Sequence, residues 1–321
     1  MNVVYFEGGA KVQKKILVVS LNPAVDKIMF LPTFSVGGIN RVATGDVVVS
    51  AGGKGVNVAR MCAQYGMPVA SVGFAAGDAG KFIALDLESH RAEVDYIWLN
   101  GETRTNLNII SENSETEILE EGPSVETDSF EKMRAKFQEH LKITSVAVFA
   151  GGLPRGVEAD AYKELIELAK REGVPTILDT SGEALIQGLK AGPDMVKPNL
   201  RELTLLLGNA NPSESEIIDK TRILMCEFGV KLFVISRGAK GAVMISDDVE
   251  ISLPAVETEI VNTIGCGDAL VAGLACGLAK GLSNLEILKL GMEFAASNAG
   301  HKEIGYIDNN LGIIDNKLNL H

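Results

Sequence analysis

The sequence has few of the residues that build metal centres or disulfide frameworks. Its 321 residues include four cysteines and four histidines. The cysteines (Cys62, Cys226, Cys266 and Cys276) form no C-x-x-C pair and have no cluster of histidines nearby, which disfavours a structural zinc site. This pattern fits a reducing compartment, so we expect a cytoplasmic protein.

An excess of positive charge and long apolar runs are also missing. The formal net charge of −12 disfavours binding to nucleic acid or to an acidic membrane surface, since both require a cationic face. No apolar run reaches the roughly 18 residues of a membrane span. A small phosphorylated ligand is still compatible with this charge, because a few cations inside a cleft act over distances of about 10 Å.

Two common nucleotide-binding motifs are absent as well. The sequence contains no G-x-x-x-x-G-K-[ST], which excludes a P-loop enzyme by pattern. It also has no G-x-G-x-x-G after the first expected strand, Ile16–Leu21. An NAD-dependent dehydrogenase is therefore a weak alternative.

The chain does contain a regular alternation of buried strands with amphipathic helices. The strands that we expect are Ile16–Leu21, Val69–Gly73, Val146–Ala150, Thr176–Asp179, Met195–Lys197 and Leu232–Ser236. The helices that we expect are Gly55–Tyr65, Gly80–Ser89, Asp128–His140, Ala159–Arg171, Leu200–Leu207 and Glu214–Phe228. This order predicts an α/β fold with a mostly parallel sheet between two layers of helices. We expect residues 1–13 to form an N-terminal extension and residues 14–321 a single domain.

Two segments interrupt this alternation, at about residues 27–50 and 96–119. Both are rich in β-forming residues and lack a helical period, and Val47–Val49 and Asn106–Ile110 are typical of strands. We interpret them as a small β-sheet lid beside the ligand site. A surface hairpin without a role is the alternative.

A glycine-aspartate turn, Gly265–Asp268, precedes an amphipathic stretch of about residues 267–280. Gly265, Cys266 and Gly267 can crowd backbone N–H groups at a helix start, where the helix dipole also favours an anion. Asp268 in the first helical turn could accept a proton from an attacking hydroxyl, and an acid of ordinary pKa would be ionised for this at pH 7. By itself, however, the pattern would fit an ordinary helix start, with Asp268 as its N-terminal carboxylate, equally well.

A second glycine loop, Ser50–Ala59, precedes another expected helix. Lys54 places a point charge at this helix start and Asn57 a polar group one turn later. The combination suits the hydroxyls and phosphate of a small substrate, although a glycine-rich turn with a solvated lysine would look the same.

Seven motifs in order resemble those of the ribokinase-like, or PfkB-type, carbohydrate kinases, and most closely the branch of 1-phosphofructokinases and tagatose-6-phosphate kinases. The resemblance extends from Ile16 to about Ile304. The motifs are Leu21–Asp26, Gly52–Asn57, Thr103–Asn106, Gly151–Pro154, Lys197–Glu202, Ser236–Gly241 and Gly265–Asp268. The family has a three-layer α/β/α fold with a β-sheet lid, and we expect the same here.

The resemblance also implies roles for individual residues around the acceptor. Asp268 is the expected catalytic base, and the expected anion hole is formed by Gly265, Cys266 and Gly267. The expected ligands of the sugar hydroxyls are Asp26, Gly53 and Asn57. The expected ligands of the phosphate on the sugar are Lys54 and Arg104, with Arg41 added from the lid of a partner subunit.

On the nucleotide side, the resemblance implies ATP as co-substrate and magnesium as cofactor. Asn199 and Glu202 resemble the Asn-x-x-Glu pair that organises Mg²⁺, through water. The expected nucleotide contacts are Lys197, Ser236, Gly238, Gly241 and Asn298. Such a site needs only one or two carboxylates, because phosphates and water complete the coordination of Mg²⁺.

One residue departs from the usual glycine-aspartate turn of the family. Cys266 stands where alanine is common. Because the two side chains are similar in size, we expect a packing substitution, with a redox switch as the alternative.

The motifs together predict phosphoryl transfer from ATP to a ketohexose phosphate. Fructose 1-phosphate is our first choice of acceptor, with tagatose 6-phosphate or fructose 6-phosphate as alternatives. A catalytically inactive sensor of sugar phosphates or nucleotides is the alternative of another class. The unpaired edges of the lid favour a homodimer that is joined through it.

Overall fold

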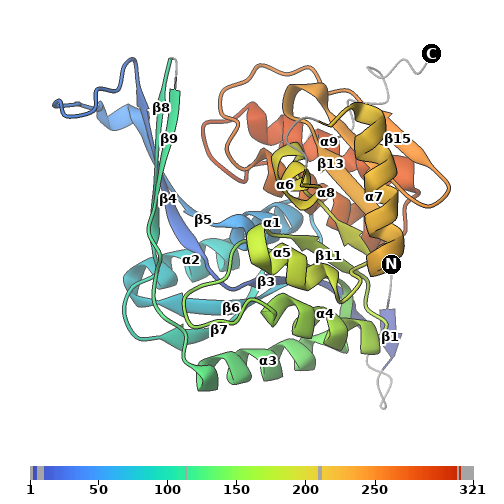
Figure 1. Ribbon diagram of the computed structural model, residues 1–321. Coiled ribbons are helices and arrows are strands. Elements are labelled where there is room, and N and C mark those ends of the chain that lie inside the picture. Colours follow the sequence, from blue (N-terminus) through green and yellow to red (C-terminus); the bar gives the residue numbers. More distant parts are fainter. Residues whose placement is uncertain (1–2, 6–10, 113, 209–211, 309–310, 312–321) are drawn as a thin grey trace.

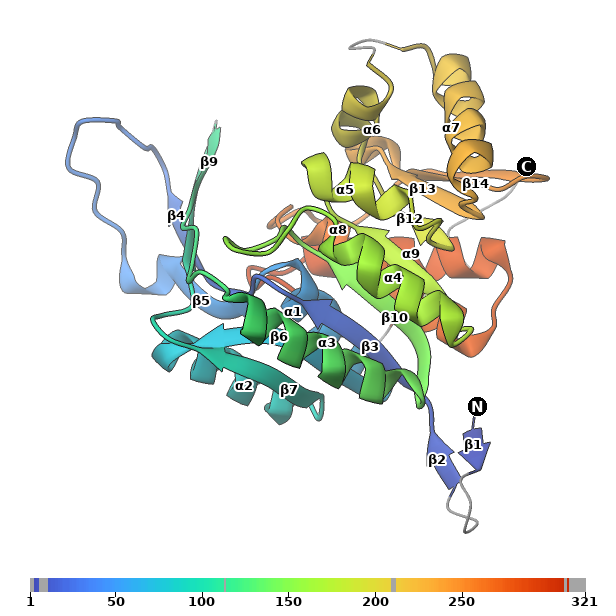
Figure 2. The ribbon, with the colours of Figure 1, turned by 60° about the horizontal axis from the view of Figure 1, so that its bottom comes forward.

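The computed structural model describes residues 3–5, 11–112, 114–208, 212–308 and 311. Within the expected N-terminal extension, β1 (Val3–Tyr5) and β2 (Lys11–Gln13) pair as a small antiparallel hairpin. Figure 2 shows this hairpin projecting from the rest of the chain. Among the described residues, no helix combines the length and apolar character needed to cross a bilayer.

A nine-stranded sheet forms the centre of the molecule, in the order β15-β14-β13-β12-β11-β10-β3-β6-β7. Neighbours from β13 to β7 are parallel, and β14 and β15 are added antiparallel at one edge. The strands are β3 (Lys15–Ser20), β6 (Val69–Ala76), β7 (Glu93–Leu99), β10 (Thr144–Ala150), β11 (Thr176–Asp179), β12 (Met195–Val196), β13 (Leu232–Ser236), β14 (Ala242–Ile245) and β15 (Glu250–Leu253).

Helices cover both faces of this sheet, as Figures 1 and 2 show. Along β3, Ile16 and Val18 belong to one buried cluster and Leu17 and Val19 to the other, because successive side chains of a strand point to opposite faces. The first cluster includes α1 (Lys54–Gln64), α2 (Gly77–Ser89), α8 (Cys266–Lys280) and α9 (Asn284–Ala299). The second includes α3 (Thr127–Leu141), α4 (Ala161–Arg171), α5 (Gly182–Leu189), α6 (Leu200–Leu206) and α7 (Glu214–Phe228). The predicted three-layer α/β/α architecture is confirmed.

A separate four-stranded sheet, in the order β5-β4-β8-β9, stands beside the main body (Figure 1). Its strands are β4 (Ala24–Leu31), β5 (Val47–Gly52), β8 (Thr105–Ser111) and β9 (Ser114–Leu119), and we call this sheet the lid. The lid begins earlier than expected, because β4 follows β3 after only three residues. The segment from residue 96, by contrast, starts inside β7, which pairs with β6 in the main sheet.

The elements that were not expected from the sequence include the helices α5 and α9 and the edge strands β14 and β15. A start signal for α9 was nevertheless present, since Ser283 and Glu286 form a capping box. The α9 helix packs closely on α8: a Cβ added at Gly273 would lie 2.6 Å from the Cα of Gly291. The last helix pair therefore depends on glycine at this crossing.

We predict that Gly273→Ala destabilises the protein. Overpacking against backbone costs about 1–3 kcal/mol, which exceeds the gain of about 1 kcal/mol from replacing a helical glycine by alanine. Urea unfolding should show a lower midpoint with an unchanged slope. Gly45→Ala is the matched control, since an added Cβ there meets no atom within 4 Å. Equal midpoints for the two variants would contradict the prediction.

Candidate active site

The glycine-aspartate turn forms the start of α8. Gly265 is the N-cap in the left-handed conformation, with φ of 79°, and a Cβ there would lie 2.5 Å from Ile304 Cγ2. The Ala269 N–H donates to Gly265 O, which is the first bond of the helix. The amides of Gly267 and Asp268 are therefore among the donors that a helix start leaves without a helical partner. They are available to an anion at this point.

The carboxylate of Asp268 is buried just inside this helix start, with a side chain that is 7% exposed. Asn57 Nδ2 donates to its Oδ2 over 2.8 Å. Burial raises the pKa of Asp268 to about 6, against the opposing effects of the Lys54 charge and the Asn57 hydrogen bond. The expectation of an ordinary pKa was wrong: desolvation tunes this acid towards neutral pH, where a general base works best.

Asp179, at the end of β11, is a central residue that the sequence analysis missed as a site residue. Its Oδ1 lies 3.2 Å from Lys54 Nζ and 3.3 Å from Lys197 Nζ. Burial opposes its charge, but the two lysines hold the pKa of Asp179 below its ordinary value. A signal was present in the sequence, because an acidic residue ended a predicted buried parallel strand, where ligand sites form.

Lys54 faces this carboxylate cluster. Burial opposes its charge, yet Asp179, Asp268 and Glu202 together raise the pKa of Lys54 above its ordinary value. The described contacts of Arg104 are with other groups, so the two cations predicted to share one phosphate are held at different points. Lys54 lies beside the expected base.

The predicted sugar ligand Asp26 lies on the first lid strand and is 4% exposed. Asn106 Nδ2 donates to Asp26 Oδ1 over 2.7 Å, and the Gly53 N–H approaches Oδ2 at 3.4 Å. Burial raises the pKa of Asp26, and these hydrogen bonds oppose the shift. A Cβ at Gly52 would lie 1.9 Å from Asp26 Oδ2, so this carboxylate requires glycine there. Asn106 is thus a second residue that the sequence analysis did not assign to the site.

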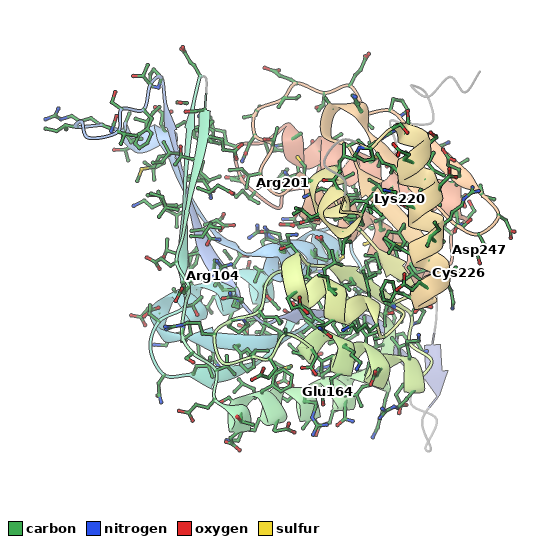
Figure 3. The ribbon with its side chains drawn as sticks, viewed as in Figure 1. Arg104, Glu164, Arg201, Lys220, Cys226 and Asp247 are labelled. Carbon is green, nitrogen blue, oxygen red and sulfur yellow. The ribbon has the colours of Figure 1, made fainter. Side chains whose placement is uncertain are left out.

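Arg104 lies where the lid joins the main body (Figure 3). Its guanidinium donates to Asn22 O through Nε and Nη2, and to Asn106 Oδ1 and Glu120 O through Nη1. These contacts occupy four of the five N–H groups of Arg104. Among the described residues the fifth N–H has no partner, so it could bind a ligand. Arg41 is exposed in the loop between β4 and β5, and no contact to the other site residues is described for it in this chain.

The predicted magnesium pair forms the start of α6. Asn199 Oδ1 accepts from the Glu202 N–H over 2.8 Å, and Glu202 Oε2 accepts from the Asn199 N–H over 2.9 Å. Asn199 and Glu202 therefore have a structural role as the capping box of this helix, whether or not they bind a metal. The capping box also lies beside the predicted nucleotide loop, since Asn199 and Ser236 form a parallel bridge.

That loop, Ser236–Gly241, is a tight turn in which Gly238 and Gly241 both have positive φ. A Cβ at Gly241 would lie 2.0 Å from Leu253 O, so the turn excludes a side chain there. Asn298, by contrast, is fully buried. It donates to Ile264 O and to Cys266 Sγ and accepts from the Gly305 N–H. The structure therefore places Asn298 behind the turn, with no exposed atom for adenine.

The fold is that of the ribokinase-like carbohydrate kinases. The model of the pfkB family carbohydrate kinases matches residues 19–308, and the chain belongs to this family. ATP is accordingly its phosphoryl donor.

Three known proteins show how closely the chain matches. A tagatose-6-phosphate kinase of Staphylococcus epidermidis is 34% identical over 296 residues, which cover 91% of this chain and 94% of that protein. Phosphofructokinase-2 of Escherichia coli, solved with potassium, superposes with a TM-score of 0.84 at 25% identity, over 93% and 96% of the chains. A possible 1-phosphofructokinase of Thermotoga maritima superposes with a TM-score of 0.81 at 27% identity, over 92% and 94%.

We predict an acid limb near pH 6 in the pH dependence of kcat/KM, which reports groups of the free enzyme. The pKa of Asp268 is about 6, so the ionised fraction falls about tenfold per pH unit below it. Asp268→Asn should lower turnover by about 10²–10⁴-fold and remove this limb, while ATP binding measured by calorimetry persists. Substantial turnover by the variant, with the same limb, would show that Asp268 is not the base.

We predict that the Cys266 thiol is inert. Burial raises its pKa, and the neighbouring carboxylate of Asp268 raises it further, against the hydrogen bond from Asn298. A thiol that is protonated at pH 7 is a poor nucleophile. Cys226 is exposed on α7 (Figure 3) and serves as the internal control.

Mass spectrometry after brief alkylation should therefore find Cys226 modified before Cys266. In a Cys226→Ala background, peroxide should inactivate the enzyme and its Cys266→Ala variant equally. Selective protection of activity by Cys266→Ala would instead establish a redox switch.

Proposed function

We propose that the protein transfers the γ-phosphoryl group of ATP to a hydroxyl of a ketohexose phosphate, with fructose 1-phosphate as the first candidate. The observation that carries this proposal is the buried base Asp268 beside a helix-start anion site that is flanked by Lys54 and Lys197. Tagatose 6-phosphate and fructose 6-phosphate are the competing acceptors, since the relatives include a tagatose-6-phosphate kinase and a phosphofructokinase.

The acceptor would be held where the lid joins the main body, by Asp26 and Arg104. Asp26 offers a carboxylate that is already fixed by Asn106 and can accept hydrogen bonds from sugar hydroxyls. Arg104 offers a positive charge, and one N–H without a partner in the part of the chain that the structure describes, to the phosphate that the sugar already carries. An unphosphorylated sugar would not need this cation.

In the transfer step, Asp268 would take the proton of the acceptor hydroxyl. The oxygen of that hydroxyl then bonds to the γ-phosphorus, the bond to the β,γ-bridging oxygen breaks, and ADP leaves. The amides of Gly267 and Asp268 and the charges of Lys54 and Lys197 would stabilise the transferring group. Phosphoryl transfer needs such positioning and neutralisation more than covalent chemistry.

Magnesium fits the residues present. The Oδ2 atom of Asp179 is buried without a hydrogen-bond partner among the described residues, and hard carboxylate oxygens are what Mg²⁺ prefers. Those residues contain no cluster of three His, Cys, Asp or Glu side chains that could hold a metal, so phosphates and water would have to supply most of the ligands. Asp179 and Glu202 would hold the ion, with Asn199 acting through water. When bound, Mg²⁺ would neutralise charge on the ATP oxygens.

A coupled assay of ADP release tests the proposed function. The panel comprises fructose 1-phosphate, tagatose 6-phosphate, fructose 6-phosphate and ribose, each with and without Mg²⁺. We expect the highest kcat/KM with fructose 1-phosphate and no turnover after removal of the metal. A preference for another ketohexose phosphate would reassign the acceptor. Calorimetric binding of a sugar phosphate without turnover on any of them would establish a sensor instead.

We further propose a homodimer that is joined through the lid. Val49 on β5 and Ile118 and Leu119 on β9 are 53%, 53% and 56% exposed, and both strands are edges of the lid sheet. Apolar side chains and unpaired backbone groups on sheet edges favour pairing with another copy. Such a dimer would allow Arg41 to reach the sugar phosphate of the partner subunit.

Light scattering after size exclusion tests this arrangement. We predict that Ile118→Lys halves the mass of the particle and weakens sugar binding, because a buried lysine would be desolvated at the interface. Ile223→Lys, at an exposed isoleucine of α7, should leave the mass unchanged. A wild-type protein that runs as a monomer while fully active would rule the dimer out.

A further inference from the structure

Arg60 is the feature of the site that the proposed chemistry leaves unexplained. It lies on α1, one helical turn after Asn57, and is a charged residue with only 4% exposure. Its guanidinium donates through all five N–H groups: Nη1 to Ala51 O and Asp86 Oδ2, Nη2 to Asn57 Oδ1 and Ile304 O, and Nε to Gly305 O. A buried arginine that is satisfied so completely is held in one orientation.

One side of this guanidinium determines how Asn57 presents its amide. Arg60 Nη2 donates to Asn57 Oδ1 over 3.1 Å, so Nδ2 is the end of the amide that faces Asp268 Oδ2 at 2.8 Å. A reversed amide would place two oxygen atoms against each other and would leave a donor of Arg60 facing an N–H group. Arg60 thereby ensures that Asn57 donates to the carboxylate.

The other side of the guanidinium holds the chain that follows α9 against the anion-hole turn. Arg60 binds the carbonyls of Ile304 and Gly305, and the Ile304 side chain packs on Gly265. The Gly305 N–H donates to Asn298 Oδ1 over 2.7 Å, and Asn298 in turn donates to Ile264 O over 2.8 Å. Two chains of contacts thus run from Arg60 to the two sides of the helix start that carries Asp268.

We propose that Arg60 is a positioning residue for phosphoryl transfer, which orients Asn57 towards the base and holds the Ile304–Gly305 segment against the turn of the anion hole. Arg60 touches neither substrate nor reacting atoms. It acts through Asn57 on the base and through Ile304 and Asn298 on the turn. The inference rests on the proposed role of Asp268 as the base.

The orientation of Asn57 has a consequence that a purely structural arginine would not have. A hydrogen bond donated to a carboxylate favours its ionised form, so loss of the Asn57 bond should raise the pKa of Asp268 further. The acid limb of kcat/KM then moves to higher pH. The other groups that face Asp268 are Lys54 on α1, Asp179 on β11 and Lys197 after β12, and the variants below leave all three in place.

Two variants test this inference from different directions. Arg60→Lys keeps the charge but offers three donors from one atom, so it cannot satisfy Asn57, Ile304 and Gly305 together. Gly305→Ala keeps Arg60 itself, but its Cβ would lie 2.4 Å from Arg60 Nη2 and displace the guanidinium. Because it leaves the side chains of Arg60 and Asp86 in the sequence, it decides the question even if Arg60→Lys fails to fold.

We expect both variants to move the acid limb upwards by about 0.5–1 pH unit, as Asn57→Ala should, with ATP affinity at pH 8 preserved. Arg60→Lys added to Asn57→Ala should move the limb no further, since the two act through one hydrogen bond. Arg134→Lys, on the surface of α3, should behave as the wild type.

A uniform loss of activity at all pH values, with the limb unmoved in both variants, would overturn the inference and leave Arg60 a structural residue. The failure of the base assignment has a different signature. In that case Asp268→Asn itself would remain active, whatever Arg60 does.

Discussion

Burial of two carboxylates, Asp268 and Asp179, at the carboxyl end of one sheet requires compensating charge, since an unpaired buried ion costs several kcal/mol. Lys54 and Lys197 provide that charge from two different elements, the start of α1 and the end of β12. The lysines lower the pKa of Asp179, while burial prevails at Asp268. One site therefore contains a carboxylate whose pKa lies below its ordinary value and another whose pKa is raised to about 6.

This division of roles explains why the two glycine loops, Ser50–Ala59 and Gly265–Asp268, must lie side by side. The proposed base at the start of α8 and the cation at the start of α1 could act on one transferring group only if both helix ends point to the same edge of the sheet. Parallel strands bring them there, because their carboxyl ends lie together. Asn57 and Asp268, which are 211 residues apart, are joined directly by a hydrogen bond in this way.

Periodicity was enough to predict six strands of the central sheet and most of the helices between them, because a strand that is buried on both faces has a continuous apolar sequence. It was not enough for β14, β15, α5 and α9, although α9 begins with a capping box. At the site, Asp268 and Lys54 stood out because each sits in a glycine motif, and Asp26 because its motif, Leu21–Asp26, resembles that of the family. Asp179, Asn106 and Arg60 were not, since their roles arise from contacts with residues far away in the chain. The raised pKa of Asp268 is likewise a product of burial, which no local pattern reveals.

The parallel pairing of β4 with β8 constrains the order in which the protein can fold. Val25 lies opposite Thr105, and Asn106 reaches Asp26 across 80 residues of intervening chain. That stretch contains α1, β6, α2 and β7, so the lid cannot close until this half of the sheet is in place. Contacts of such long range form slowly, because the entropy of closing the loop is lost before the contacts compensate for it. The proposed sugar site, which depends on this contact, should thus be among the last parts of the protein to mature during synthesis.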